Sequence, residues 1–148
     1  MNASQLRQAL RSGRRVYGTL IVSASPRWPD TVARIGLDFV FIDTEHIALD
    51  RARDWKLTVV EASLSLLDGK ARVHTLPRAR ALGLSVIAKR ALANVPWLSR
   101  VDEGDDVKRQ RERYLRAALP DCGIAPAELF LRFAAFTPGV HTVLLGTS

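Results

Sequence analysis

With 148 residues, 47% of them hydrophobic and 25% charged, the chain has the size and composition of one globular domain. Its single cysteine, Cys122, excludes an internal disulfide and a metal site built from several cysteines. We expect no secretory signal, and no stretch approaches the ~18 apolar residues of a membrane-spanning helix. We therefore predict a cytoplasmic protein with no membrane partner.

The formal net charge is +7, from 22 Lys and Arg against 15 Asp and Glu. Basic surfaces attract polyanions, so this balance leaves open a non-enzymatic binding or scaffold protein. Most of the arginines are scattered along the chain. The one concentrated run, from Lys108 to Arg116, follows acidic residues between Asp102 and Asp106. That order suits a helix with carboxylates at its positive end, so we predict a solvated helix face and expect no nucleic-acid partner.

The first third of the chain alternates helical and extended patterns. We predict a helix from Ser4 to Gly13, a strand over 16–22, a helix from Pro26 to Gly36 and a buried strand over 37–42. The last strand ends in the polar sequence Asp43-Thr44-Glu45-His46. Ionisable groups therefore gather where a predicted strand ends.

Residues 47–56 show no periodicity, and the same alternation resumes after them. We predict strands over 57–64, 84–88 and 140–145, and helices over 71–82, around Lys108–Arg116 and from Pro126 to Thr137. Pro77 falls inside the predicted helix 71–82, so it marks either a kink or a later helix start. Residues 66–69 read as a turn.

Five apolar strands that alternate with helices predict an α/β fold with parallel strands and right-handed crossovers. A complete (β/α)8 barrel typically needs about 250 residues, so a chain of this length can form only part of one. The predicted fold class is therefore a partial barrel of the TIM type.

The N-terminal segment resembles a known enzyme family. The matching residues are Leu10-Arg11-Ser12-Gly13, Val16-Tyr17-Gly18-Thr19 and the stretch 34–46. Residues 1–51 thereby resemble the start of the HpcH/HpaI aldolase (citrate lyase-like) family. That family makes or cleaves carbon–carbon bonds of 2-keto acids with a divalent metal. The resemblance implies an acid/base role for His46, which Asp43 and Glu45 could orient.

The metal ligands and a substrate-binding arginine of that family come from later strands, which have no counterpart in this sequence. Without a Lewis acid, an imidazole alone can do little to stabilise an enolate. We therefore expect no divalent metal. A metal-dependent 2-keto acid aldolase activity centred on His46 remains an alternative function.

After a junction at 52–56, residues 57–148 resemble the last three βα units of an aldo/keto reductase. The matching stretches are 59–68, 81–94, 126–133 and 138–148. The resemblance implies NADP(H) as cofactor. It assigns the pyrophosphate to the loop at Arg90 and Leu92, and the adenosine 2′-phosphate to Gly146, Thr147 and Ser148. Backbone amides and an arginine fork suit phosphate groups.

This sequence departs from the reductase pattern at several positions. Glu61 stands where the family usually has a glutamine against the nicotinamide, and Lys89 where it often has a stacking tyrosine. The family's Asp, Tyr, Lys and His tetrad belongs to its first half, which has no counterpart here. We therefore predict weak NADP(H) binding without hydride transfer, in a fusion of two barrel fragments that forms one structural unit.

The strand order follows from the two resemblances only if the barrel arrangement is kept. In a closed barrel the eighth strand neighbours the first, so the strands of the second piece could continue directly into those of the first. An open sheet with a rearranged order is the alternative. Either arrangement leaves two unpaired edges, which predicts self-association.

Overall fold

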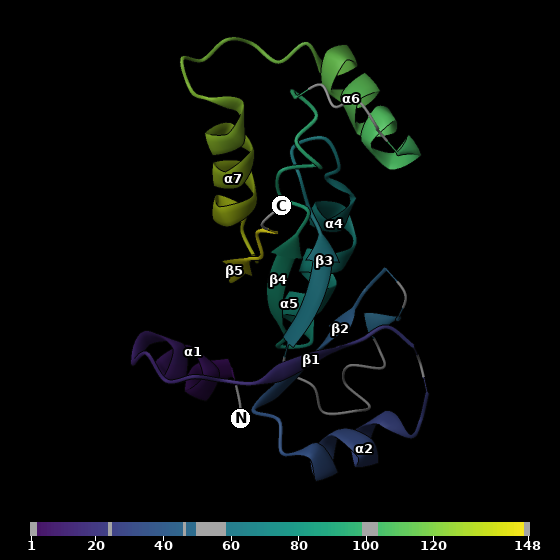
Figure 1. Cartoon of the computed structure of the whole chain (residues 1–148), viewed down its shortest axis with the longest axis vertical. Coiled ribbons are helices and arrows are strands. Elements are labelled where there is room, and N and C mark those ends of the chain that lie inside the picture. Colours follow the sequence, from purple (N-terminus) through teal and green to yellow (C-terminus); the bar gives the residue numbers. More distant parts are fainter. Residues whose placement is uncertain (1–2, 24, 46, 50–58, 99–103, 147–148) are drawn as a thin grey trace.

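The computed structural model describes residues 3–23, 25–45, 47–49, 59–98 and 104–146, and it contains one sheet of five parallel strands (Figure 1). The strands are β1 (Gly18–Ile21), β2 (Phe39–Asp43), β3 (Val59–Ser63), β4 (Ser85–Lys89) and β5 (Thr142–Val143). The predicted fold class, parallel strands alternating with helices, is confirmed. The predicted junction at 52–56 and the catalytic candidate His46 lie outside the described residues.

Six helices connect or flank these strands in the described part of the chain. They are α1 (Ala3–Arg11), α2 (Trp28–Ile35), α4 (Lys70–Val73), α5 (Thr75–Ala81), α6 (Asp105–Ala117) and α7 (Pro126–Phe136). Pro77 lies in the first turn of α5, where its missing N–H costs no hydrogen bond. The predicted helix 71–82 is therefore interrupted at His74, shortly before Pro77, and continues as α5. Gly36, with φ 74°, ends α2 as predicted.

The strands lie in the order β1-β2-β3-β4-β5, which is the order of the chain. Ile42 pairs with Val60 and Asp43 with Glu61, so β2 neighbours β3. Of the two arrangements left open by the sequence, the structure has an open sheet, in which the last strand does not lie beside the first. Strands that are consecutive in the chain are thus also neighbours in the sheet, as is usual for parallel βαβ units. β1 and β5 form the two edges of the described sheet.

The hydrophobic core lies on one face of the sheet. The register places Ile21, Ile42, Val60 and Val86 in one row across β1 to β4. All four are at most 2% exposed. Leu76 and Ala79 of α5 belong to the same cluster, and Phe133 of α7 packs against it. Residues of α5 and α7 thus pack on this face of the sheet, as helices do on the wall of a barrel.

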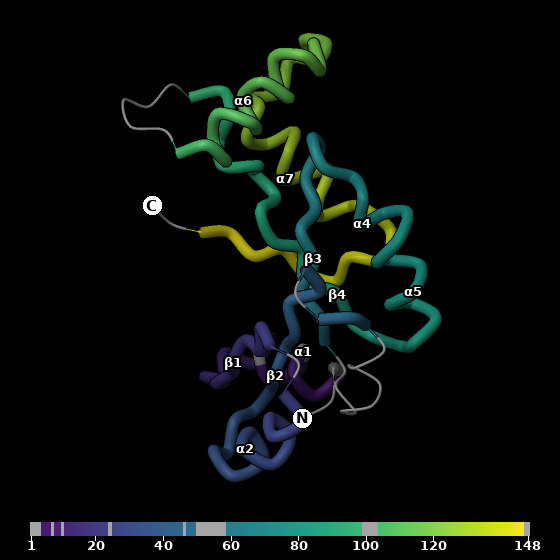
Figure 2. The backbone as a smooth tube through the Cα atoms, turned by 90° about the vertical axis from the view of Figure 1, so that its right-hand side faces the viewer, coloured from purple at the N-terminus to yellow at the C-terminus, as the bar shows by residue number. Residues whose placement is uncertain are grey.

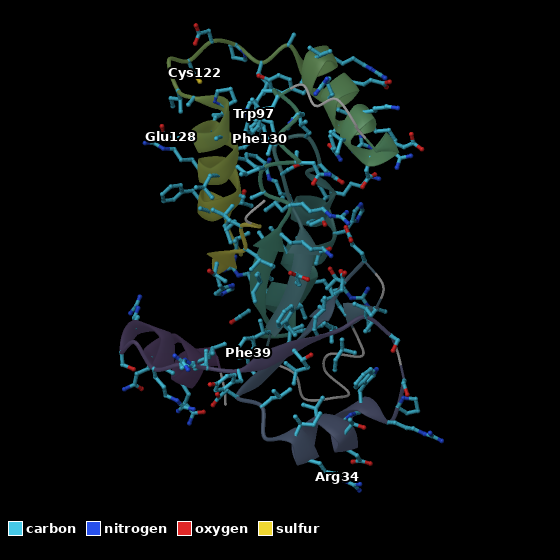
Figure 3. The ribbon with its side chains drawn as sticks, in the orientation of Figure 1. Arg34, Phe39, Trp97, Cys122, Glu128 and Phe130 are labelled. Carbon is cyan, nitrogen blue, oxygen red and sulfur yellow. The ribbon has the colours of Figure 1, made fainter. Side chains whose placement is uncertain are left out.

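The sheet is strongly twisted, and α6 and α7 lie beyond its carboxyl end while α2 lies at the far end near β1 (Figures 1 and 2). Trp97, which follows β4, packs on Phe130 of α7 at a centroid distance of 5.1 Å (Figure 3). Tyr114 of α6 lies 6.2 Å from both rings. This aromatic contact holds α6 and α7 together above the sheet.

Candidate functional site

Charged side chains meet at the carboxyl ends of β2, β3 and β4. Asp43 ends β2, Lys89 ends β4, and Glu61 lies between them on β3. Lys89 Nζ donates a hydrogen bond to Asp43 Oδ2 at 2.6 Å. The same nitrogen lies 3.1 Å from Glu45 Oε2 and 3.9 Å from Glu61 Oε2. We call these four residues the Lys89 cluster.

The Lys89 cluster is buried to different depths. Asp43 and Glu61 are each 3% exposed, whereas the Glu45 side chain is 32% exposed. Burial opposes the charged form of Lys89, but its hydrogen bonds to Asp43 and Glu45 outweigh burial and raise the pKa of the ammonium group. Lys89 therefore keeps its proton at neutral pH.

The pKa values of the two glutamates in the Lys89 cluster shift in opposite directions. Burial raises the pKa of Glu61, and the positive charge of Lys89 does not fully offset it. Burial would also raise the pKa of Glu45, but the neighbouring Ser63 hydroxyl, Lys89 and Arg90 lower it below its ordinary value. The cluster therefore combines a carboxyl that favours its neutral form with one that favours its anion.

Backbone contacts fix the strand end that carries Asp43 and Glu45. The amide of Glu45 donates to Asp43 Oδ1 at 3.0 Å, and the amide of Ile47 donates to the Asp43 carbonyl at 2.9 Å. The hydroxyl of Thr44 donates to the Glu61 carbonyl at 2.7 Å. The end of β2 is thus held against β3, so the carboxylates are positioned before any ligand arrives.

The loop after β4 carries the predicted cofactor residues Arg90 and Leu92. Arg90 has φ 56°, and Ala93, Asn94 and Val95 also have positive φ. Such backbone is costly for residues other than glycine and concentrates at functional sites. The Arg90 side chain is 54% exposed, and its Nη1 lies 3.4 Å from Glu45 Oε1. Arg90 is therefore accessible but already has an anionic partner.

The end of β5 lies beside this loop. The amide of Leu144 donates to the Ala88 carbonyl at 2.8 Å, and Val143 pairs with Ala88. Beyond this pairing β5 ends at Val143, and Gly146 is exposed. Arg90 lies one residue beyond β4 and Gly146 three residues beyond β5, and their assignment to one cofactor stays a prediction. Thr147 and Ser148 lie outside the described residues.

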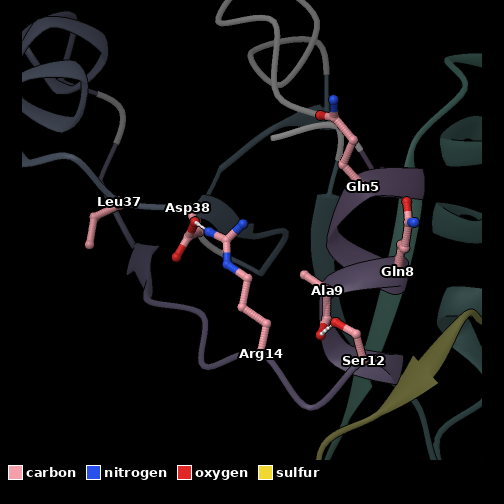
Figure 4. Close-up of a pocket in the computed structure, with 7 residues that line it drawn as sticks. All are labelled: Gln5, Gln8, Ala9, Ser12, Arg14, Leu37 and Asp38. Atoms are coloured by element: carbon pink, nitrogen blue, oxygen red, sulfur yellow. Dashed lines mark hydrogen bonds and ion pairs between the residues drawn. The ribbon is translucent and has the colours of Figure 1, made fainter.

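The cavity volumes limit what could bind near Arg90. A cavity of about 30 Å³ beside Arg90 and Asn94 is too small for a nucleotide, so a cofactor at this loop would lie on the open surface. A cavity of about 550 Å³ lies instead between α1 and the start of β2, where Arg14 forms an ion pair with Asp38 (Figure 4). This cavity lies at the amino ends of the strands, whereas the Lys89 cluster lies at their carboxyl ends.

The chain's two tyrosines lie away from the Lys89 cluster. Tyr17 immediately precedes β1, at the amino end of the sheet, and Tyr114 packs against Trp97 and Phe130. Among the described residues, no group of three or more His, Cys, Asp or Glu side chains is arranged to hold a metal ion. No described helix is long and apolar enough to cross a membrane.

The basic residues of α6 and α7 are largely paired on the surface. Arg109 binds Asp106 at 2.7 Å, and Arg116 binds Glu112 at 2.8 Å. Hydrogen bonding to Arg109 lowers the pKa of Asp106. Pairs at these spacings are typical of a solvated helix face. They agree with the interpretation of the basic run made from the sequence.

Sequence reasoning found the residues of the Lys89 cluster but not their convergence. Asp43 and Glu45 were recognised at a predicted strand end, and Glu61 and Lys89 only as departures from the reductase pattern. The sequence signal for their convergence was their position near the carboxyl ends of predicted strands, because the carboxyl ends of neighbouring parallel strands meet at one edge of a sheet. Using it required knowing that β2 neighbours β3.

Comparisons with known proteins identify the fold. No family model and no curated protein matches the sequence. The glycerol dehydrogenase AKR11B4 from Gluconobacter oxydans is similar over 96% of this chain and 54% of its own, at 10% identity and a TM-score of 0.57. The holo form of aldo-keto reductase AKR11C1 from Bacillus halodurans is similar over 92% of this chain and 64% of its own, at 14% identity and a TM-score of 0.56.

The chain thus spans between 54% and 64% of the length of these two structures. The structural comparison shows a partial barrel fold. At these identities the likeness concerns the fold alone. The aldolase resemblance of residues 1–51 stays a prediction.

Proposed function

We propose that the chain is a partial barrel of the aldo/keto reductase type that binds NADP(H) weakly at the ends of β4 and β5 and does not transfer hydride by itself. The observation that carries this proposal is the position of Arg90. Its guanidinium is exposed, and Arg90 directly follows β4, the strand that pairs with β5. Ligands of α/β sheets bind at the carboxyl ends of the strands.

The residues at these strand ends fit the phosphate part of the cofactor. The planar guanidinium of Arg90 matches two phosphate oxygens, and the exposed backbone at Gly146 permits close approach. Leu92 contributes from the same loop, and Thr147 and Ser148 are assigned to the 2′-phosphate. When bound, the cofactor supplies or accepts hydride at its nicotinamide ring.

Weak binding follows from the carboxylates around Arg90. A phosphate must compete with Glu45, whose Oε1 lies 3.4 Å from Arg90 Nη1. Asp43 belongs to the same cluster and adds negative charge. Repulsion between like charges lowers the affinity for an anionic ligand.

Hydride transfer to a carbonyl also needs a proton donor. Lys89 is unsuited to that task because Asp43 and Glu45 stabilise its charged form. Tyr17 and Tyr114 contact other parts of the molecule. The proposal is therefore a cofactor-binding domain without turnover.

The test is a thermal melt of the full chain with NADPH, with NADH and without nucleotide. We expect NADPH near ten times its dissociation constant to raise the midpoint by about 3–6 °C, and NADH, which lacks the 2′-phosphate, by less. Arg90→Met should abolish the rise. Arg132→Met is the matched control, because Arg132 is an exposed arginine paired with Glu128 on α7.

A midpoint that NADPH leaves unchanged, or that rises equally in the Arg90 and Arg132 variants, contradicts cofactor binding at this loop. Absence of turnover is tested separately with glycerol and NADP⁺, since one structural neighbour is a glycerol dehydrogenase. Formation of NADPH by the purified chain would contradict that part of the proposal.

We further propose that the chain joins an aldolase-like segment, 1–51, to a reductase-like segment, 57–148, and that it self-associates through the edges of the sheet. Tyr17 and Leu20 at β1 are 59% and 39% exposed, and Leu144 after β5 is 53% exposed. Unpaired edges with apolar side chains recruit further strands. Sedimentation should show an oligomer that Leu20→Lys dissociates; a wild-type monomer at all concentrations contradicts self-association.

A further inference from the structure

The sheet face that carries the Lys89 cluster has a second, apolar part at the amino ends of the strands. Phe39 precedes Asp43 by four residues on β2, and Val59 precedes Glu61 by two on β3. Side chains two or four residues apart on a strand share a face. The face is therefore polar at one end and apolar at the other.

A cavity of about 570 Å³ lies at this apolar end. Phe39, Val59 and Ile87 contribute from three neighbouring strands, Val140 from the segment before β5, and Leu6 from α1. The volume falls within the 300–1,000 Å³ range of small-molecule sites. Among the described residues the cavity has apolar walls sufficient for the body of an organic ligand.

Two donor groups lie on the wall of the same cavity. Arg11, the last residue of α1, is one, and His141, immediately before β5, is the other. The backbone amide of Val86 donates to His141 Nδ1 at 3.0 Å. The neutral imidazole therefore carries its proton on Nε2 and can donate it to a ligand.

The backbone holds His141 in place. Its own amide donates to the Val86 carbonyl at 2.9 Å, so the residue is tied to β4 by both its main chain and its ring. Arg11 is exposed and forms no ion pair with another described residue in the structure. An arginine fork that pairs with no carboxylate in the described part of the chain is suited to bind one from a ligand.

We propose that this cavity binds a small organic acid, with the carboxylate at Arg11 and His141 and the apolar body against Phe39, Val59 and Ile87. The proposed ligand class follows from charge complementarity at one side and apolar area at the other. This site is independent of the proposed NADP(H) site, which lies at the opposite ends of the strands.

The experiment compares octanoate with 1-octanol, which has the same chain length and no charge, by calorimetric titration of the full chain. We expect octanoate to bind at least roughly tenfold more tightly, because hydrogen bonds to charged groups exceed neutral ones by that order. Arg11→Gln should remove this advantage and leave octanol binding unchanged. Arg15→Gln is the matched control, because Arg15 is exposed and does not line the cavity.

A second variant tests the location without changing charge. Leu6→Trp on α1 fills the cavity from the helix side and should abolish binding of both ligands, with a thermal melt to verify that it folds. Equal affinities of octanoate and octanol for the wild type overturn the proposal. So does octanoate binding that survives Leu6→Trp, or that falls equally in the Arg11 and Arg15 variants.

Discussion

The two regions of the chain on either side of 50–58 contribute unequally to the core. In β3 the four residues from Val59 to Ala62 are all buried, whereas in β1 only Ile21 is buried. The flanking helices show the same contrast. α2 buries none of its residues fully, while α7 buries Phe130 and Ala134.

This difference in burial indicates which region of the chain contributes most to stability. Residues 59–146 form two well-covered strands with helices packed on them, and residues 3–49 are attached to them through the pairing of β2 with β3. Stability in such a molecule is not uniform, because regions with little buried apolar area open at lower cost. We expect the first region to open before the second.

The largest expected effect tests the better-packed region. Phe130 is 0% exposed and contacts Trp97, so Phe130→Ala should lower the free energy of unfolding by about 3–5 kcal/mol in urea titration. Phe136 on the same helix is 81% exposed and is the matched control, with an expected change within about 0.5 kcal/mol. Equal losses in the two variants would show that α7 does not pack as described.

A smaller effect is expected in the first region, where Gly18 leaves room for a ring. A Cβ at Gly18 would lie 2.3 Å from Phe39 Cζ, which no side chain tolerates without movement. Gly18→Ala should therefore cost about 1–3 kcal/mol and increase amide hydrogen exchange in β1 and β2. Gly146→Ala, with nothing within 4 Å of the added atom, is the control. Amide hydrogen exchange that increases first in β3 would contradict the expectation that the first region opens before the second.

The smallest expected effect is on the pH dependence of stability, which should differ between variants of Glu61 and Glu45. Because the pKa of Glu61 is raised on folding, its contribution is present at low pH and is lost as pH rises through its folded value. Glu61→Gln should thus gain stability relative to wild type between pH 4 and pH 7. The pKa of Glu45 is lowered, so its contribution appears above its unfolded value and is lost as pH falls.

Glu45→Gln should therefore lose stability relative to wild type over the same interval, opposite in sign to Glu61→Gln. Urea midpoints at both pH values measure the two differences. Differences of the same sign would mean that the two carboxyls do not occupy distinct environments around Lys89.

Local elements were predictable from the sequence because local chemistry determines them. Gly36 ends α2 in the left-handed conformation that glycine adopts readily, and Pro126 begins α7 where a missing N–H costs nothing. Apolar runs located all five strands, although β5 spans only Thr142–Val143 of the predicted 140–145. Periodicity and end signals act over a few residues, so one sequence suffices to read them.

Some residues near the candidate site were named from the sequence, and their role in cofactor binding stays a prediction. The reductase resemblance singled out Arg90 and Gly146, and the structure places them at the ends of neighbouring strands. The carboxylate partner of Arg90 was not foreseen, since Glu45 lies 45 residues away in the chain. A pairing over that distance depends on which strands are neighbours.

The sequence alone thus determined the alternation of strands and helices and the apolar runs that form the strands. The strand order, the convergence of Asp43 and Glu61 on Lys89, and the cavity at Arg11 and His141 were decided only by the tertiary structure. The physical reason is the separation along the chain of the residues that interact. Hydrogen bonding within a helix and alternation along a strand are set by nearby residues, whereas the pairing of β2 with β3 and the charges it gathers depend on packing the whole sheet.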